Sequence, residues 1–121
     1  MPIFLYGFGY EDKIDMECNR RTGSDYESST GVFIDAGSEE EALEWGREIS
    51  EAFVRYEHDD PSVSWRALGY AHWIEHDQES GSWKHCLSFF PRVRVGEFPD
   101  FSRMTTKAYV DWCKENGLQD A

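Results

Sequence analysis

The stretch IFLYGFGY, residues 3–10, decides the fold class of this chain. Successive side chains of a strand point to opposite sides, and every second residue here is aromatic, a type that favours strands. One side carries Phe4, Tyr6, Phe8 and Tyr10, and the other carries Ile3, Leu5, Gly7 and Gly9. We therefore expect a first strand that is apolar on both sides.

The sequence SEEE, residues 38–41, predicts a helix start. It forms a capping box, because the Ser38 hydroxyl can accept from the third helical N–H while Glu41 reaches back. Apolar residues then recur at three- and four-residue steps to about Tyr56. Gly46 lies on this stripe and costs about 1 kcal/mol relative to alanine, so it needs a packing reason. We expect it to bring the helix close to the sheet, with the glycines of the first strand as counterparts.

The rest of the chain predicts further strands and a second helix. The turn composition of residues 77–82 predicts a hairpin, and helical spacing of apolar residues returns near the carboxyl end. The predicted strands are 3–10, 28–36, 65–76, 83–90 and a short edge strand at 93–95, and the predicted helices are 38–56 and 105–116. The result is a single α+β domain, residues 1–121, of order β-β-α-β-β-(β)-α. Two helices pack on one face of a mainly antiparallel sheet of four to five strands.

Residues 11–29 are polar and acidic, and their best turn signal lies at residues 22–25. We expect this segment to be either a long hairpin tip or a mobile loop.

The aromatic side of the first strand needs a cover, since two helices on one face leave the other face open. A dimer through the open face, a lid formed by residues 11–29, or a ligand pocket would each supply one. Ordinary core packing, with tyrosine hydroxyls reaching solvent, is the remaining interpretation.

The chain is strongly acidic: 24 Asp and Glu oppose 12 Lys and Arg, giving a formal net charge of −12 over 121 residues. This charge repels phosphate backbones and anionic lipids, so we expect neither nucleic-acid nor membrane binding. It attracts a basic protein, although it also serves plain solubility. The three cysteines Cys18, Cys86 and Cys113 form no C-x-x-C pair. Reduced thiols and the absence of a targeting or membrane-spanning stretch predict a cytoplasmic location.

Sequence motifs give no positive sign of catalysis, a cofactor or a metal. His72 and His76 lie about 13 Å apart along a strand, which is too far for one ion, and zinc needs three or four converging ligands. The chain has no nucleophile elbow, phosphate-binding loop or dinucleotide fingerprint. Cys86 follows Lys84 and His85, yet it falls in a predicted strand, where burial is usual. We predict no metal and no cofactor, and we favour a protein that is not an enzyme.

The leading hypothesis is a small bacterial-type binding protein that neutralises or regulates a basic partner, as an immunity or inhibitor module does. Acidic side chains would steer association and aromatic ones would anchor it. The predicted partner-binding residues are Glu11, Asp12, Asp15, Glu17, Asp25, Glu40, Glu44, Tyr6, Tyr10, Tyr70 and His72. One alternative is a small-molecule-binding domain or enzyme with a pocket between the long loop and the sheet face of Tyr6, Tyr70 and His72. A second alternative is a structural homodimer that uses the aromatic face.

Overall fold

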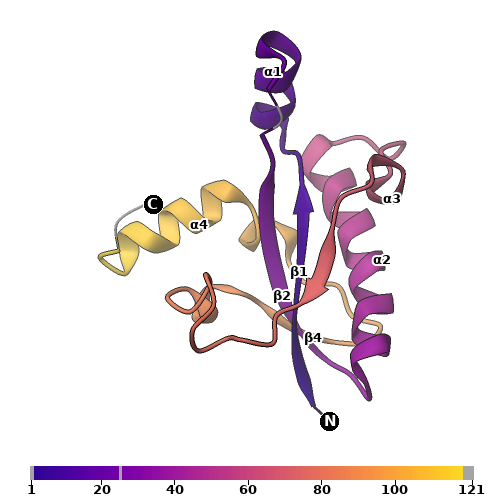
Figure 1. Ribbon diagram of the computed structural model, residues 1–121, viewed down its shortest axis with the longest axis vertical. Helices are drawn as coiled ribbons and strands as arrows, with labels where there is room; N and C mark the ends of the chain where they lie inside the picture. Colours follow the sequence, from indigo (N-terminus) through magenta and orange to yellow (C-terminus); the bar gives the residue numbers. More distant parts are fainter. Residues whose placement is uncertain (1, 25, 119–121) are drawn as a thin grey trace.

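Four strands form one mixed sheet in the computed structural model of the protein, which describes residues 2–24 and 26–118 (Figure 1). They are β1 (Ile3–Tyr10), β2 (Ser28–Asp35), β3 (His72–Ile74) and β4 (Arg92–Arg94), and their order in the sheet is β3-β1-β2-β4. β1 pairs antiparallel with β2 and β3, whereas β4 runs parallel to β2. The α+β class is confirmed, and the parallel pairing of β4 departs from the antiparallel sheet that we predicted.

Four helices and two helical turns accompany the sheet in the described part of the chain. The helices are α1 (Lys13–Thr22), α2 (Glu39–His58), α3 (Trp65–Leu68) and α4 (Thr106–Glu115), and the 3₁₀ turns are η1 (Leu87–Phe89) and η2 (Phe101–Arg103). The predicted positions of α2 and α4 are confirmed, because capping and apolar spacing mark both in the sequence.

α2 covers the aromatic side of β1. The rings of Phe8 and Phe53 meet edge to face with centroids 5.6 Å apart, and those of Tyr10 and Phe53 with centroids 4.9 Å apart. Phe8 and Tyr10 are buried within this cluster. α2 therefore supplies the cover that the aromatic side requires, and of the four aromatic residues on that side only Phe4 is partly exposed.

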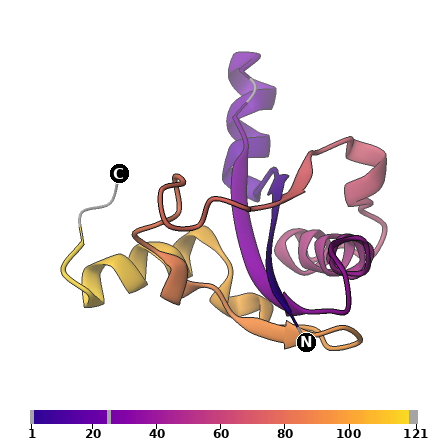
Figure 2. The ribbon, with the colours of Figure 1, turned by 60° about the horizontal axis from the view of Figure 1, so that its bottom comes forward.

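The opposite face of the sheet is covered by residues 83–90 and α4. Leu5 and Phe33 point to this side, where Trp83 and Trp112 belong to the same apolar cluster. Figure 2 shows α2 and α4 on opposite sides of the sheet. The prediction of two helices on one face is thus wrong: the chain uses one helix for each face because both faces of β1 are apolar.

The predicted loop at 11–29 contains α1, which projects beyond the end of the β1–β2 hairpin (Figure 1). Asp12 and Asp15 form a capping box at its start, and Gly23 ends it with φ of 73°. α1 has no buried residue and therefore no apolar stripe, so the spacing of apolar residues in the sequence does not predict it.

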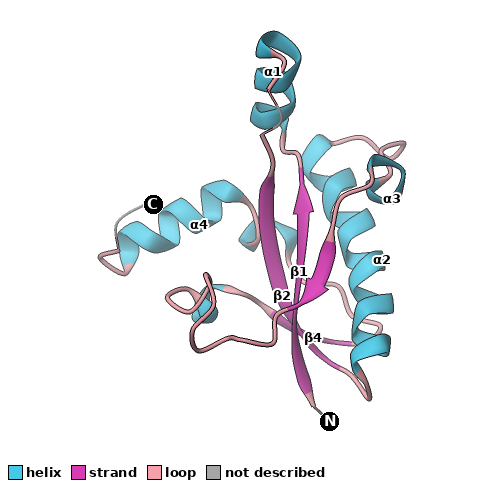
Figure 3. Ribbon diagram, viewed as in Figure 1, coloured by secondary structure: helices cyan, strands magenta, loops and turns pink. Residues whose placement is uncertain are grey.

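The predicted hairpin of residues 65–76 and 83–90 is also wrong. The Ser64 side chain caps α3 by accepting from the Ala67 N–H, so the strand shrinks to β3. Residues 83–90 form turns and η1, drawn as loop with one short helical turn in Figure 3. After β3 the chain crosses the sheet face rather than returning beside it, and this crossing brings β4 to the far edge, parallel to β2.

Candidate functional site

Tyr6 and Tyr10 are 0% and 1% exposed, so burial removes both from any partner-binding surface. The Tyr6 hydroxyl lies 2.8 Å from the Ser50 hydroxyl and 3.2 Å from His72 Nδ1, and the Ser50 hydroxyl donates to the Gly46 carbonyl over 2.9 Å. Each of the three bonds has one donor if His72 Nδ1–H donates to the Tyr6 hydroxyl and the Tyr6 hydroxyl donates to Ser50. This series of hydrogen bonds ends at the Gly46 carbonyl of α2, so all of its polar groups are satisfied inside the core.

Tyr6 and His72 are both uncharged in this network near neutral pH. Burial raises the pKa of Tyr6, and burial together with the charge of Arg47 lowers the pKa of His72. Ser50 and Trp65 occupy the space beside Tyr6 and His72, two of the residues at which we predicted a ligand pocket.

Several predicted partner-binding acids hold the end of the hairpin instead. Glu11 accepts from the Asn19 amide and from the Tyr70 hydroxyl, over 2.8 and 2.7 Å. Asp15 accepts from the Ser28 hydroxyl over 2.7 Å, and Asp12 accepts from the Asp15 N–H over 2.7 Å. The side chains of Glu11, Asp12, Asp15 and Tyr70 therefore stabilise the end of the hairpin through hydrogen bonds within the protein.

The remaining predicted acids are exposed, except for one that cannot be placed. Glu17 lies on α1, and Glu40 and Glu44 lie on α2, all with exposed side chains. Asp25 lies outside the described residues. Of the predicted set, Glu17, Glu40 and Glu44 thus remain available to a partner.

The start of α2 is strongly acidic. His76 Nε2 lies 3.0 Å from the Glu39 carboxylate, so His76 contacts the first turn of the helix. We call the first turns of α2 the acidic end; it consists of the exposed residues Glu39, Glu40, Glu41 and Glu44. Among the described residues, only Glu39 of these four takes part in an ion pair. The acidic end therefore presents carboxylates whose charge is largely uncompensated.

Four aromatic rings, two of them exposed and two partly buried, run along the side of α2. The Trp45 ring lies 4.9 Å from that of Phe98, Phe98 lies 6.1 Å from Phe101, and Phe101 lies 5.8 Å from Tyr56. We call these four residues the aromatic strip. Phe98 is 53% exposed and Tyr56 is 48% exposed, and the Trp45 indole is fixed by donating to the Glu97 carbonyl over 2.8 Å. Trp45 lies four residues after Glu41, one helical turn along the same side of α2, so the aromatic strip adjoins the acidic end.

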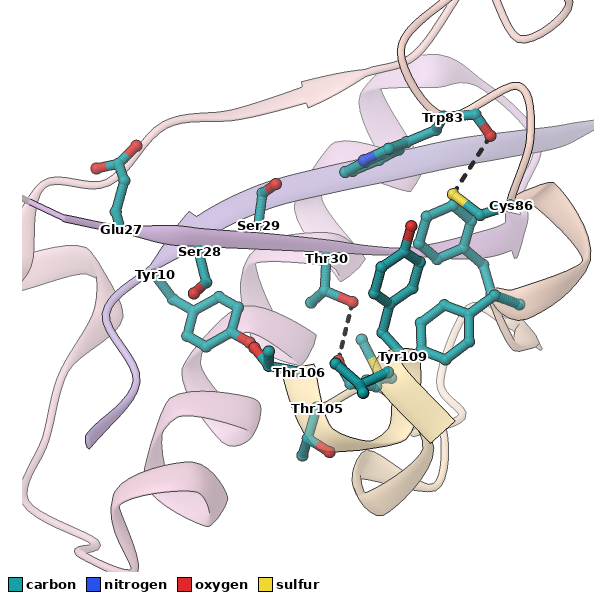
Figure 4. Close-up of a pocket in the computed structure, with 14 residues that line it drawn as sticks. Tyr10, Glu27, Ser28, Ser29, Thr30, Trp83, Cys86, Thr105, Thr106 and Tyr109 are labelled. Carbon is teal, nitrogen blue, oxygen red and sulfur yellow. Dashed lines mark hydrogen bonds between the residues drawn. The ribbon is translucent and has the colours of Figure 1, made fainter. Parts of the chain in front are cut away.

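A cleft of about 390 Å³ opens on the other side of the molecule, between β2, residues 83–90 and the start of α4 (Figure 4). β4 pairs with β2 only over Phe33–Asp35, so among the described residues no strand pairs with the first half of β2 on this edge. The cleft lies along that half. Its lining residues are Tyr10, Glu27, Ser28, Ser29, Thr30, Trp83, Cys86, Phe89, Phe90, Met104, Thr105, Thr106, Tyr109 and Val110.

Cys86 and Thr30, two residues of the cleft that carry a thiol and a hydroxyl, are both engaged in hydrogen bonds. Burial raises the pKa of the Cys86 thiol to about 11, so the thiol is protonated at neutral pH, and its Sγ–H donates to the Trp83 carbonyl over 3.4 Å. The Thr30 hydroxyl donates to the Met104 carbonyl over 3.1 Å. These groups are suited to shaping a binding surface and not to attacking a substrate.

Among the residues that the structure describes, no group of three or more His, Cys, Asp or Glu side chains could hold a metal ion. None of the helices described is long and apolar enough to cross a membrane.

Sequence reasoning missed the aromatic strip, the cleft and the contact of His76 with Glu39. Phe98 stands in the loop sequence Gly96-Glu97-Phe98-Pro99, and an aromatic residue between turn formers is a weak signal of exposure. The cleft depends on residues from three distant segments, and no local pattern brings these together.

Comparisons with known proteins find no family model, no curated protein and no solved structure that matches this chain.

Proposed function

We propose that the protein binds a basic protein along α2 and thereby neutralises or regulates it, as an immunity or inhibitor module does. The observation that carries the proposal is the meeting of the acidic end and the aromatic strip on one helix. Surface carboxylates steer a basic partner, and exposed aromatic rings anchor it once it has arrived.

The charge distribution supports the binding of a basic protein along α2. Arg47 and Arg55 interrupt the acids of α2, but Arg55 is occupied by the Glu51 carboxylate at 3.1 Å. Six ion pairs form among the described residues, against 24 acidic residues in the sequence. The uncompensated charge favours fast encounter with a basic surface and weakens with added salt.

The aromatic strip supports the second half of the proposal. Aromatic residues are enriched at the centres of protein interfaces, where truncation of one ring can strongly reduce the binding affinity. Phe98 offers the most exposed ring of the strip and has no hydrogen-bonding group that would prefer water. It would be the anchor, and the acidic end would form the charged rim.

The test compares capture of proteins from a lysate of the source organism by the wild type and by two variants of equal charge. Glu40→Gln/Glu44→Gln changes the acidic end, and Asp111→Asn/Glu115→Gln removes the same two charges from α4. We expect one basic protein to be retained at low salt by the wild type and by the α4 variant, and to elute at lower salt from the α2 variant. Phe98→Ala should release the same protein faster at unchanged charge. Equal losses in both double variants, or retention of acidic proteins only, would contradict the proposal.

A further inference from the structure

We propose that the cleft between β2, residues 83–90 and α4 binds an organic cation, that is, an ammonium group carried on an apolar stem. This inference concerns a surface other than the acidic end and does not depend on the proposed partner. Three properties of the cleft carry it: its aromatic wall, its charge and its size.

One wall of the cleft is a continuous run of aromatic rings. The centroids of Trp83 and Phe90 lie 4.8 Å apart, those of Phe90 and Phe89 lie 5.6 Å apart, and those of Phe89 and Tyr109 lie 5.3 Å apart. The planes of these successive pairs are inclined by 53°, 67° and 81°. Rings set at such angles present faces as well as edges, and the electron-rich face of an aromatic ring attracts a cation.

The charge of the cleft selects the same class of ligand. Glu27 is the one charged residue among the described residues that line the cleft, and none of them is Lys, Arg or His. Figure 4 shows Glu27 at one end of the cleft and Trp83 at the other. An anion would meet no positive group here and would be repelled by the net charge of −12, whereas a cation is attracted by both.

The size and polarity of the cleft fit a small molecule or one long side chain. A volume of about 390 Å³ falls within the range of pockets that bind small ligands. The deep polar groups already have partners, because Thr30 donates to Met104 and Cys86 to Trp83. A ligand that needs few buried hydrogen bonds and makes its main contacts with ring faces suits such a lining.

The first experiment compares choline with 3,3-dimethylbutan-1-ol, in which carbon replaces the charged nitrogen at the same shape. Both are titrated into ¹⁵N-labelled protein and followed by NMR. We expect choline to shift the Thr30, Cys86 and Tyr109 amides and the Trp83 indole signal. The neutral isostere should bind roughly tenfold more weakly, because it lacks the attraction to ring faces and to Glu27. Equal binding of the two compounds, or shifts confined to other surfaces, would overturn the proposal.

Two variants assign the binding to the cleft. Val110→Trp fills the cleft from α4, and Lys114→Trp places the same ring on an exposed position of that helix. Choline binding should be lost in the first variant and retained in the second. Glu27→Gln changes only an exposed side chain, so we expect this variant to fold even if Val110→Trp does not. It should weaken choline binding about threefold. Unchanged binding in both Val110→Trp and Glu27→Gln would contradict the assignment.

The source of the cation is distinguished by a second pair of probes. Nα-acetyl-lysine N-methylamide carries the ammonium on a peptide-like backbone, and n-butylammonium carries it on a free stem. Tighter binding of the lysine derivative indicates a side chain of a protein, and equal or tighter binding of butylammonium indicates a free amine. Binding of neither probe, together with no binding of choline, would overturn the proposal.

Discussion

Gly46 is the point at which α2 lies closest to the sheet. A Cβ built at this position would overlap the ring of the buried Tyr6. We predict that Gly46→Ala destabilises the fold: overpacking a core costs about 1–3 kcal/mol, and the gain in helix propensity offsets only about 1 kcal/mol of this. The close approach was predictable from the glycine, but its counterpart is a tyrosine rather than a glycine of β1.

Urea unfolding of Gly46→Ala measures this effect, with Gly37→Ala as the control. A Cβ at position 37 would meet only the Glu41 carboxylate at 3.8 Å, an ordinary contact. We expect the control to change the free energy of unfolding by less than about 0.5 kcal/mol. A Gly46→Ala protein as stable as the control would show that α2 can shift away from Tyr6 without loss.

His72 makes stability depend on pH. Its pKa is lowered from the ordinary 6.5, chiefly by burial and also by the charge of Arg47. Below pH 6.5 the unfolded chain therefore binds more protons at this ring than the folded chain does. The free energy of unfolding should fall as the pH drops from 6.5 to the folded pKa, and the contribution is complete above 6.5.

The measurement is a series of urea unfolding curves between pH 7.5 and pH 5 for the wild type and for His72→Gln. The variant loses the bond to Tyr6 and starts from a lower stability, so the slope against pH is the informative quantity. We expect a shallower slope in the variant. Equal slopes would mean that His72 takes up its proton in the fold as readily as in the unfolded chain.

At the scale of elements, α1 should open independently of the rest of the fold. It has no buried residue, and its stability depends on the reciprocal bonds of Asp12 and Asp15. We predict that Asp12→Ala increases hydrogen exchange in α1 about fivefold, as expected for loss of an N-cap worth about 1 kcal/mol. Exchange in α2 should not change. Asp12→Asn keeps a capping side chain and should behave like the wild type.

An equal loss of protection in α1 and α2 would contradict this account of α1, because it would place both helices in one cooperative unit. The comparison needs only exchange rates resolved by segment.

The elements divide into those that the sequence predicts and those that it does not, for a physical reason. β1, β2, α2 and α4 each show an apolar period and, for the helices, a capping residue. α1 and α3 are specified by caps alone, at Asp12 and Ser64, and periodicity does not detect them. Residues 83–90 are apolar enough to resemble a strand, yet they cover a face of the sheet and do not extend it.

For the whole molecule, composition predicts the sign of the charge but not its location. Glu40 and Glu44 are predictable as exposed acids because they lie on the polar side of a capped helix. The contact of His76 with Glu39 spans 37 positions of sequence, so no local pattern predicts it. Tyr6 and Tyr10 were assigned to a binding surface because periodicity identifies a strand face without revealing that α2 covers it.

The central claim is that a basic partner is steered to the acidic end of α2. Its most direct test is the association rate constant of the captured partner, measured by stopped-flow fluorescence at increasing salt. We predict a rate that falls about tenfold or more with salt for the wild type and for Asp111→Asn/Glu115→Gln. Glu40→Gln/Glu44→Gln should associate more slowly at low salt and show a weaker salt dependence. The same rate and the same salt dependence in all three proteins would contradict the claim.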